Sequence, residues 1–194
     1  MKDIRGRGEN GVQVIVIGID PGTANTGFGV VRVSGERMVA IDGGVIETPA
    51  DLSVERRLAS LHDSLAELIR WHEPRAMALE ELFFGKNVAS ALSVGEARGV
   101  AMLAAAQQSL PCFGYTPQAV KKAVCGSGSA DKGQVQKMVA SLLGLPEPPS
   151  PDHAADAFAV AICHAGSPAG RHAVAQFGRA AVAPPAVARQ RLAG

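Results

Sequence analysis

The sequence contains few cysteines and no apolar segment long enough to cross a membrane. The 3 cysteines among 194 residues form no CxxC pair, which argues against a disulfide framework and against a zinc site. The apolar runs fall well short of the ~20 residues that a transmembrane helix needs. The charged N-terminus is not followed by the apolar stretch of a secretory signal. We therefore expect a protein that has free thiols, works in the reducing cytoplasm and does not enter a membrane.

The sequence also lacks a strong excess of one charge sign, because its formal net charge is only +1. The charges are nevertheless divided unevenly along the chain. Residues 14–82 carry 6 basic and 11 acidic side chains, whereas residues 83–137 carry 6 basic and 2 acidic ones. The middle segment could therefore present a basic face beside an acidic site. The alternative is that its lysines only solvate helix surfaces.

The apolar patterns predict five strands and five helices. Val14–Asp20 is a β-branched run that ends in a carboxylate and is stopped by Pro21 and Gly22, which is typical of a buried strand. Leucines spaced three and four residues apart between Leu58 and Leu68 indicate an amphipathic helix that ends before a proline. The expected strands are 14–20, 28–33, 38–47, 75–80 and 111–115, and the expected helices are 54–73, 87–109, 117–124, 131–143 and 152–164.

The order of these elements predicts the fold class. Three successive strands with short connections, followed by strands that alternate with helices, form a mixed sheet covered by helices on both faces. The order β-β-β-α-β-α-β-α-α-α is that of the α/β ribonuclease-H-like fold with a five-stranded sheet. We expect one folded domain at residues 14–166, a disordered N-terminal arm at residues 1–13, and a disordered Ala, Pro and Arg tail at residues 167–194.

Side chains able to bind a metal lie at two strand ends and near the start of one helix. Asp20 ends the first strand, Glu80 ends the fourth, and His153 and Asp156 lie three residues apart on one face of the last helix. If the first and fourth strands are neighbours, these four groups can meet. Oxygen ligands with one imidazole suit Mg²⁺ or Mn²⁺ better than zinc or copper. Two such ions ~4 Å apart can hold the attacking water and the leaving oxygen of a phosphodiester.

Each of these four residues also has an ordinary structural explanation. Asp20 could only start a turn, where aspartate is common, and Glu80 could be a solvated strand end. Asp156 could favour a helix N-terminus electrostatically, and His153 could be a plain surface residue. Taken one at a time, none of them identifies a metal site.

Five motifs, in order along the chain, resemble those of the bacterial Holliday-junction resolvase family RuvC. They are GIDPGT at 18–23 with TGFGVV at 26–31, LEELFF at 79–84 followed by Lys86-Asn87, GEARG at 95–99, GSGSADK at 126–132 with Gln134-Val135, and DHAADA at 152–157. The resemblance extends from about Val14 to His164. Five separate motifs in the same order make it highly specific, whereas GIDPG alone would not be.

The resemblance implies a metal-dependent endonuclease that resolves four-way (Holliday) DNA junctions by paired symmetric nicks during homologous recombination and DNA repair. It implies catalytic and metal-binding roles for Asp20, Glu80 and Asp156. The fourth family position falls on His153, where many members have aspartate. The implied cofactor is Mg²⁺, two ions per site, with Mn²⁺ able to substitute or preferred. The implied partners are four-way junction DNA, a second copy of the chain, and the RuvA and RuvB branch-migration proteins.

The resemblance also assigns DNA contacts. Phe83 matches the aromatic residue that inserts at the junction centre, and Lys121 and Lys132 match basic residues that contact phosphates. Phe84 and Lys86 lie beside Phe83, where aromatic and basic side chains could contact the bases and phosphates of an opened junction. From the residues alone, the two phenylalanines could equally belong to the core, and Lys121 could simply solvate a helix.

Two other functions are compatible with parts of the sequence. The loop that begins at Gly18 also resembles the phosphate loop of actin, Hsp70 and sugar-kinase proteins. Those proteins use two domains, whereas this chain is short and has no second Asp-x-Gly strand end. A catalytically inactive junction-binding module is the other alternative. It is disfavoured because all four ligand positions carry residues able to bind metal.

Overall fold

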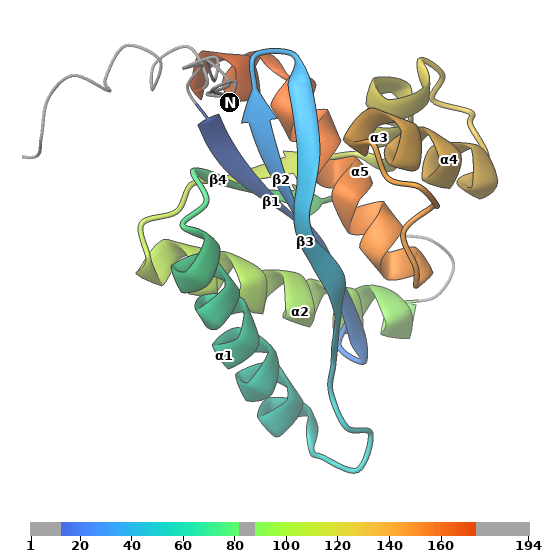
Figure 1. Cartoon of the computed structure of the whole chain (residues 1–194). Helices are drawn as coiled ribbons and strands as arrows, with labels where there is room; N and C mark the ends of the chain where they lie inside the picture. Colours follow the sequence, from blue (N-terminus) through green and yellow to red (C-terminus); the bar gives the residue numbers. More distant parts are fainter. Residues whose placement is uncertain (1–12, 82–87, 174–194) are drawn as a thin grey trace, which may run out of the picture.

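The computed structural model describes residues 13–81 and 88–173, which form one layered α/β unit (Figure 1). Its strands are β1 (Gln13–Asp20), β2 (Asn25–Ser34), β3 (Arg37–Glu47), β4 (Ala76–Glu80) and β5 (Cys112–Tyr115). Its helices are α1 (Val54–His72), α2 (Val88–Gln107), α3 (Pro117–Cys125), α4 (Lys132–Leu143) and α5 (Asp152–Gly166). None of the helices described is both long and apolar enough to cross a membrane.

The five strands form one mixed sheet in the order β3-β2-β1-β4-β5. β1 pairs with β2 and β2 with β3 in antiparallel fashion, whereas β1 and β4, and β4 and β5, are parallel. This arrangement confirms the predicted fold class. The register aligns Ile19 of β1 with Leu79 of β4. Asp20 and Glu80 are one residue further along each strand. They therefore lie side by side at the carboxyl ends of these two parallel strands.

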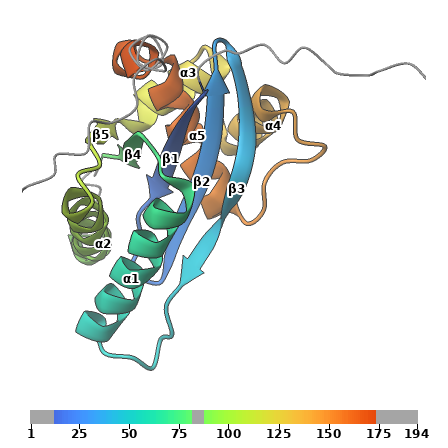
Figure 2. The same ribbon diagram turned by 60° about the vertical axis from the view of Figure 1, so that its left-hand side comes forward.

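The two faces of the sheet are covered by different helices, α1 and α2 on one side and α3, α4 and α5 on the other (Figures 1 and 2). Each side has its own apolar core. Ile17 and Ile19 of β1 pack with α1 and α2, whereas Val14 and Val16 pack with α5. Since side chains alternate along a strand, Asp20 is directed toward the α5 side. The same alternation places Glu80 on that side, because Ala78 belongs to the α5 core.

Helix α5 lies directly against the backbone of the sheet. A Cβ atom on Gly18 would come within 2.1 Å of the carbonyl oxygen of Ala157. A Cβ on Gly27 would come within 2.0 Å of the carbonyl oxygen of His153. Glycine is required at these positions because α5 approaches too closely for any side chain. This close approach sets the height of His153 above the end of β1.

Several predicted boundaries are wrong by a few residues. β1 begins at Gln13, inside the predicted arm, and β2 begins at Asn25, three residues before the predicted start at residue 28. The predicted tail begins too early, because residues 168–173 are helical and follow closely on α5. Ser167 anchors this turn by accepting a hydrogen bond from the backbone N–H of Gly170, a polar contact that apolar periodicity does not reveal. The remaining residues of both predicted termini lie outside the described residues.

The contact between α5 and the sheet leads to a stability prediction. We expect Gly18→Ala to lower the free energy of unfolding by ~1–3 kcal/mol, because the new methyl group overlaps the α5 backbone. Gly166→Ala is the matched control, because a Cβ at that helical glycine meets nothing within 4 Å. Urea denaturation of both variants measures the difference. Equal stability of the two would show that α5 can move away from the sheet at little cost.

Candidate active site

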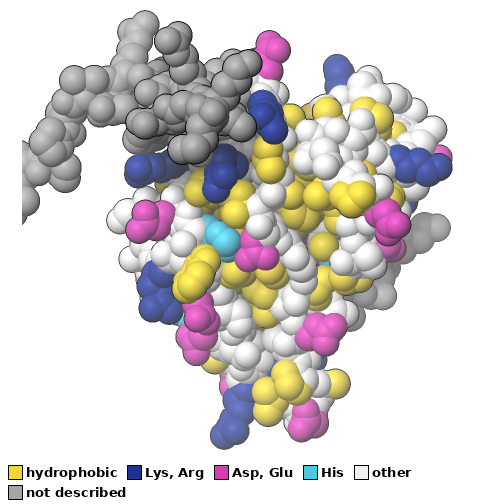
Figure 3. Space-filling model, viewed as in Figure 1, with side chains coloured by type: hydrophobic (Ala, Val, Ile, Leu, Met, Phe, Trp, Pro, Cys, Tyr) yellow, Lys and Arg dark blue, Asp and Glu magenta, His cyan; other side chains and the backbone are white. Residues whose placement is uncertain are grey.

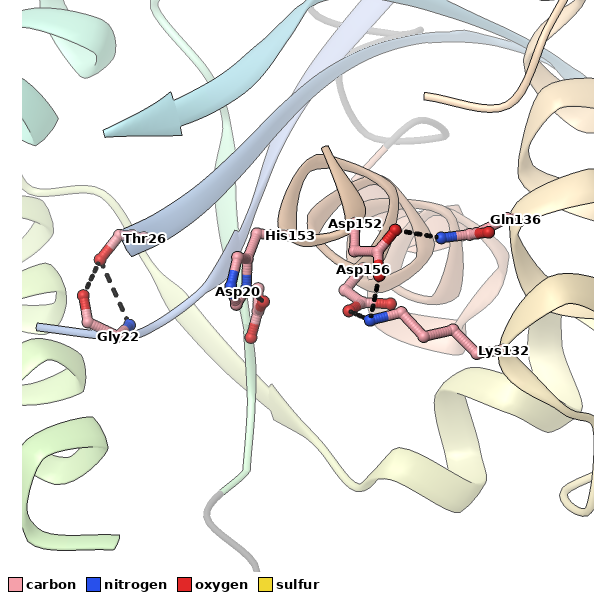
Figure 4. Close-up of polar contacts among 8 residues, drawn as sticks. All are labelled: Asp20, Gly22, Thr26, Lys132, Gln136, Asp152, His153 and Asp156. Carbon is pink, nitrogen blue, oxygen red and sulfur yellow. Dashed lines mark hydrogen bonds and ion pairs between the residues drawn. The ribbon is translucent and has the colours of Figure 1, made fainter. Parts of the chain in front are cut away.

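Asp20 and His153 are joined across the interface between β1 and α5. The Nδ1–H of His153 donates a hydrogen bond to Oδ2 of Asp20 over 2.7 Å (Figure 4). The two side chains differ in exposure, at 17% for Asp20 and 47% for His153. Burial raises the pKa of Asp20, and the hydrogen bond from His153 opposes that rise. His153 therefore stabilises the ionised form of a carboxylate that is largely removed from water.

Asp156 lies one turn further along α5 and is paired with a lysine from α4. Lys132 Nζ is 3.3 Å from Oδ2 of Asp156 and 3.1 Å from Oδ2 of Asp152 (Figure 4). Gln136, also on α4, donates a hydrogen bond to Asp152 over 2.8 Å. These contacts tie the start of α5 to the start of α4. They also hold a positive charge beside the carboxylate of Asp156.

Lys132 is positioned by a well-formed helix start. The side chain of Asp131 accepts a hydrogen bond from the backbone N–H of Gln134, and the side chain of Gln134 accepts one from the backbone N–H of Asp131. This reciprocal capping box satisfies two backbone donors and fixes the first turn of α4. The side chain of Lys132, the first residue of that turn, reaches the acids of α5.

Glu80 is the most electrostatically perturbed acid of the group. Burial raises its pKa, the charges of Asp20 and Asp156 raise it further, and the result is about 7. The positive charge of Lys121 opposes this shift. Asp20 comes from β1 and Asp156 from α5, yet both act on the ionisation of Glu80 at the end of β4. The tertiary structure therefore brings together the three acids predicted from the sequence.

A pocket of about 210 Å³ opens beside these acids. Glu80, Asp156, Lys121 and Lys132 contribute its polar lining, and Val120, Val135, Ala159 and Val160 contribute apolar lining. Both lysines predicted to contact DNA therefore border the cavity that contains two of the acids. Phe83, Phe84 and Lys86, the other predicted DNA-contacting residues, lie outside the described residues.

The acids and the histidine fit a divalent cation by chemistry, although they do not form a closed set of ligands. Among the described residues, no three His, Cys, Asp or Glu side chains are close enough together to form a ready-made metal-binding group. His153 and Lys132 instead compensate the charges of Asp20 and Asp156. Carboxylate oxygens with one imidazole nitrogen are suited to Mg²⁺ or Mn²⁺. A divalent cation would also offset the burial and the repulsion from Asp20 and Asp156 that together raise the pKa of Glu80.

The loop after Asp20 is held by contacts that sequence reasoning did not identify. The hydroxyl of Thr23 donates to the backbone carbonyl of Ser93 on α2 over 2.7 Å, and the hydroxyl of Ser93 donates to Thr23 over 2.6 Å. Thr26 closes the loop on itself by donating to the carbonyl of Gly22 (Figure 4). These threonines belong to the GIDPGT and TGFGVV motifs, so the motifs themselves were the available signal. Their hydrogen bonds support the backbone next to Asp20.

Known proteins are similar to the part of the chain that contains this site. The sequence profile of the family described as "Crossover junction endodeoxyribonuclease RuvC" matches residues 16–164. This chain belongs to the RuvC family. The match includes Asp20, Glu80, His153 and Asp156 and ends before the helical turn at residues 168–173.

Individual RuvC proteins are similar over the same length. The RuvC of Pelotomaculum thermopropionicum is 52% identical over 152 residues, which is 78% of this chain and 93% of that protein. The RuvC of Rubrobacter xylanophilus is 52% identical over 151 residues, 78% of this chain and 84% of that protein. The structure of Thermus thermophilus RuvC in complex with Holliday junction substrate superposes with a TM-score of 0.75 at 38% identity, covering 78% of this chain and 93% of that chain.

The environment of Glu80 predicts how stability depends on pH without metal. Because its folded pKa of about 7 exceeds the ordinary value of 4.5, the folded protein retains a proton that the unfolded chain releases between these values. The contribution of Glu80 to the free energy of unfolding therefore falls as the pH rises from 4.5 to about 7. In EDTA, we expect Glu80→Gln to melt at a higher temperature than wild type at about pH 8 and at a similar temperature at about pH 4.

Glu81→Gln is the matched control, since Glu81 is the neighbouring acid and is exposed. It should follow wild type at both pH values when the melting temperature is measured by calorimetry. An equal gain from both substitutions would indicate a general effect of removing negative charge rather than the buried environment of Glu80.

Proposed function

We propose that this protein resolves Holliday junctions by paired, symmetric, metal-dependent nicks in homologous recombination and DNA repair. Membership of the RuvC family supports the reaction class. The observation that carries the assignment of the site is the convergence of Asp20 and Asp156 on Glu80, whose pKa is raised to about 7 by burial and by these two charges. Such a cluster of acids is arranged for a cation rather than for fold stability.

In the proposed mechanism, Asp20, Glu80 and Asp156 would hold Mg²⁺ or Mn²⁺, and His153 would complete the set of ligands. Bound divalent ions would supply an activated water and charge stabilisation for the leaving oxygen of the phosphodiester. Asp20 and Glu80 are held at adjacent strand ends, so the sheet fixes the spacing between their carboxylates. The hydrogen bond from His153 orients the carboxylate of Asp20. Lys132 exchanges its ion pair with Asp156 for a DNA phosphate when the substrate arrives.

Loss of any acid should separate cleavage from binding. We expect Asp20→Asn, Glu80→Gln and Asp156→Asn each to reduce junction cleavage by at least ~10³-fold, while the dissociation constant for a labelled four-way junction changes little. The reason is that these acids hold metal, whereas affinity comes mainly from phosphate contacts. Cleavage is followed on gels with Mg²⁺, Mn²⁺ or EDTA, and binding by gel shift. Asp63→Asn, an exposed acid on α1, is the control and should cleave normally.

This experiment also tests the alternative of an inactive junction-binding module. Uncut junctions with the wild-type protein in both metals would favour that alternative. Paired nicks that persist after substitution of Asp20 or Glu80 would place the chemistry elsewhere in the chain.

Lys121 is proposed to contact a DNA phosphate beside the acids. It lines the same pocket as Glu80 and is close enough to affect the ionisation of that residue. We expect Lys121→Ala to weaken junction binding and to reduce the slope of log affinity against log salt by roughly 0.9. Lys122→Ala is the control, since it removes the same charge from the next residue, which is exposed. Equal slopes for the two variants would mean that Lys121 only solvates α3.

The protein is proposed to act as a homodimer through α2. Ala97, Ala101, Ala104 and Ala105 of this helix are fully buried in the core, so the small residues pack on the sheet side. The opposite face exposes Leu92, at 65%, and Leu103, at 52%, with Gly99 between them on the same stripe. An apolar stripe of this kind is typical of a protein interface. Two copies would supply the two sites that symmetric nicking needs.

A charge placed on this stripe should separate the subunits. We expect Leu103→Glu to elute as a monomer in light-scattering chromatography and to lose paired nicking while remaining folded. Val54→Glu is the control, because Val54 is also apolar and exposed but lies at the start of α1. A Leu103→Glu protein that remains dimeric would show that the interface lies on another face.

The remaining proposals follow from family membership. RuvA and RuvB are proposed as partners, and the cytoplasm as the location, because the substrate is chromosomal DNA. The nuclease domain is proposed to extend from Gln13 to residue 173. Phe83, Phe84 and Lys86 remain proposed contacts to the junction centre.

A further inference from the structure

A second and larger pocket lies at the end of the sheet opposite the acids. It encloses about 750 Å³ between the end of α1, the starts of β4 and β5, and residues 164–173. Asp20 and Glu80 lie where their strands end, whereas this pocket lies where β4 and β5 begin. The volume falls within the range of small-molecule sites. The proposed nuclease function makes no use of it.

One wall of this pocket is built by a segment outside the family match. Ala169, His172 and Ala173 line it, and all three follow residue 164, where the match to the RuvC profile ends. Ser167 fixes this wall by donating to the carbonyl of His164 over 2.7 Å and by accepting from Gly170 N–H over 3.0 Å. This wall is therefore contributed from outside the matched range, whereas the rest of the lining lies within it.

A neutral histidine borders this pocket. His164 is among the lining residues although it is only 1% exposed, and burial lowers the pKa of its imidazole to about 4, which keeps the ring neutral near pH 7. The hydroxyl of Ser167 donates its hydrogen to the carbonyl of His164. Ser167 therefore accepts from the hydroxyl of Tyr115, over 3.2 Å. Tyr115 must then accept from Nδ1–H of His164 over 2.7 Å. This tautomer leaves Nε2 as an acceptor, and no described residue donates to it.

The rest of the lining combines a flat apolar surface with positive charge. Leu110 and Phe113 contribute apolar surface, and the ring of Phe113 lies 4.5 Å from that of His164. Arg70, Arg75 and His172 are basic, whereas Glu73 is the one acid in the lining. Figure 3 shows Lys and Arg side chains gathered toward the end of the molecule where the described chain begins. A complementary ligand would carry a flat ring with an N–H donor and an anionic group.

We propose that this pocket binds a nucleotide. The base packs against Phe113 and donates an N–H to Nε2 of His164, and the phosphate faces Arg70 and His172. The same chemistry is offered by a free nucleotide and by an unpaired nucleotide at the end of a DNA strand. This proposal is independent of junction cleavage, because the pocket contains none of the acids of the candidate active site.

The test is calorimetric titration of the full-length protein with adenosine monophosphate in EDTA, which excludes metal-dependent binding at the acids. We expect saturable binding that Arg70→Ala weakens by at least about tenfold, through loss of a charge-assisted hydrogen bond. Ala169→Trp should also abolish it by filling the pocket. Arg56→Ala is the matched control, since Arg56 is an exposed arginine at the other end of α1. Both test positions are exposed, so normal melting temperatures are expected for these variants.

Competition then identifies the source of the nucleotide. A duplex with one unpaired, phosphorylated end nucleotide is compared with a closed circle of the same sequence as competitor for the labelled monophosphate. Competition by the open duplex alone would indicate DNA ends, and competition by neither would indicate a free nucleotide; both results support the pocket. Absence of saturable binding would overturn the proposal, as would equal weakening by Arg70→Ala and Arg56→Ala. Binding seen only after deletion of residues 174–194 would also overturn it, because the chain itself would then fill the pocket.

Discussion

The contact between α5 and a glycine-lined strip of the sheet determines the rest of this structure. Gly18, Gly27, Gly29 and Gly43 present no side chains to α5, and Phe158 of α5 packs against the last two of them. At these four positions the helix meets backbone atoms, which are much less adaptable than side chains. The rotation of α5 is fixed as a result. His153 and Asp156 are then held over the ends of β1 and β4.

The acids gathered by this contact are costly to the fold. Asp20 and Glu80 are both destabilised as anions by burial, and each is also affected by Asp156. His153 and Lys132 offset part of the cost, one by a hydrogen bond to Asp20 and the other by ion pairs to Asp152 and Asp156. The site thus stores electrostatic strain that a cation can relieve. Such strain is expected where function rather than stability selects the residues.

The end of α5 is held by polar groups of a different kind. Tyr115, His164 and Ser167 form a connected hydrogen-bond chain that fixes the end of α5 to β5. Tyr115 is the last residue of β5 and is aligned with Glu80 in the register of β5 and β4. Its hydroxyl therefore connects the strand end beside Glu80 to the end of α5. The helix is held near its start by ionic contacts and at its end by neutral ones. Asp156, Ala159 and Val160 of α5 line the smaller pocket, whereas His164 lines the larger one.

The sequence by itself determined the order and type of the elements, because the β-branched runs and the leucine spacing are local patterns. It also determined the four candidate ligands, since GIDPGT, LEE and DHAAD place them at strand ends and on one helix face. It did not determine that Lys132 pairs with Asp152 and Asp156, that Thr23 binds Ser93, or that residues 168–173 are helical. These contacts join residues by polar groups, and apolar periodicity carries no information about them. Only the tertiary structure decided the pKa of Glu80 and the acceptor on His164, because both depend on burial and on neighbours distant in the chain.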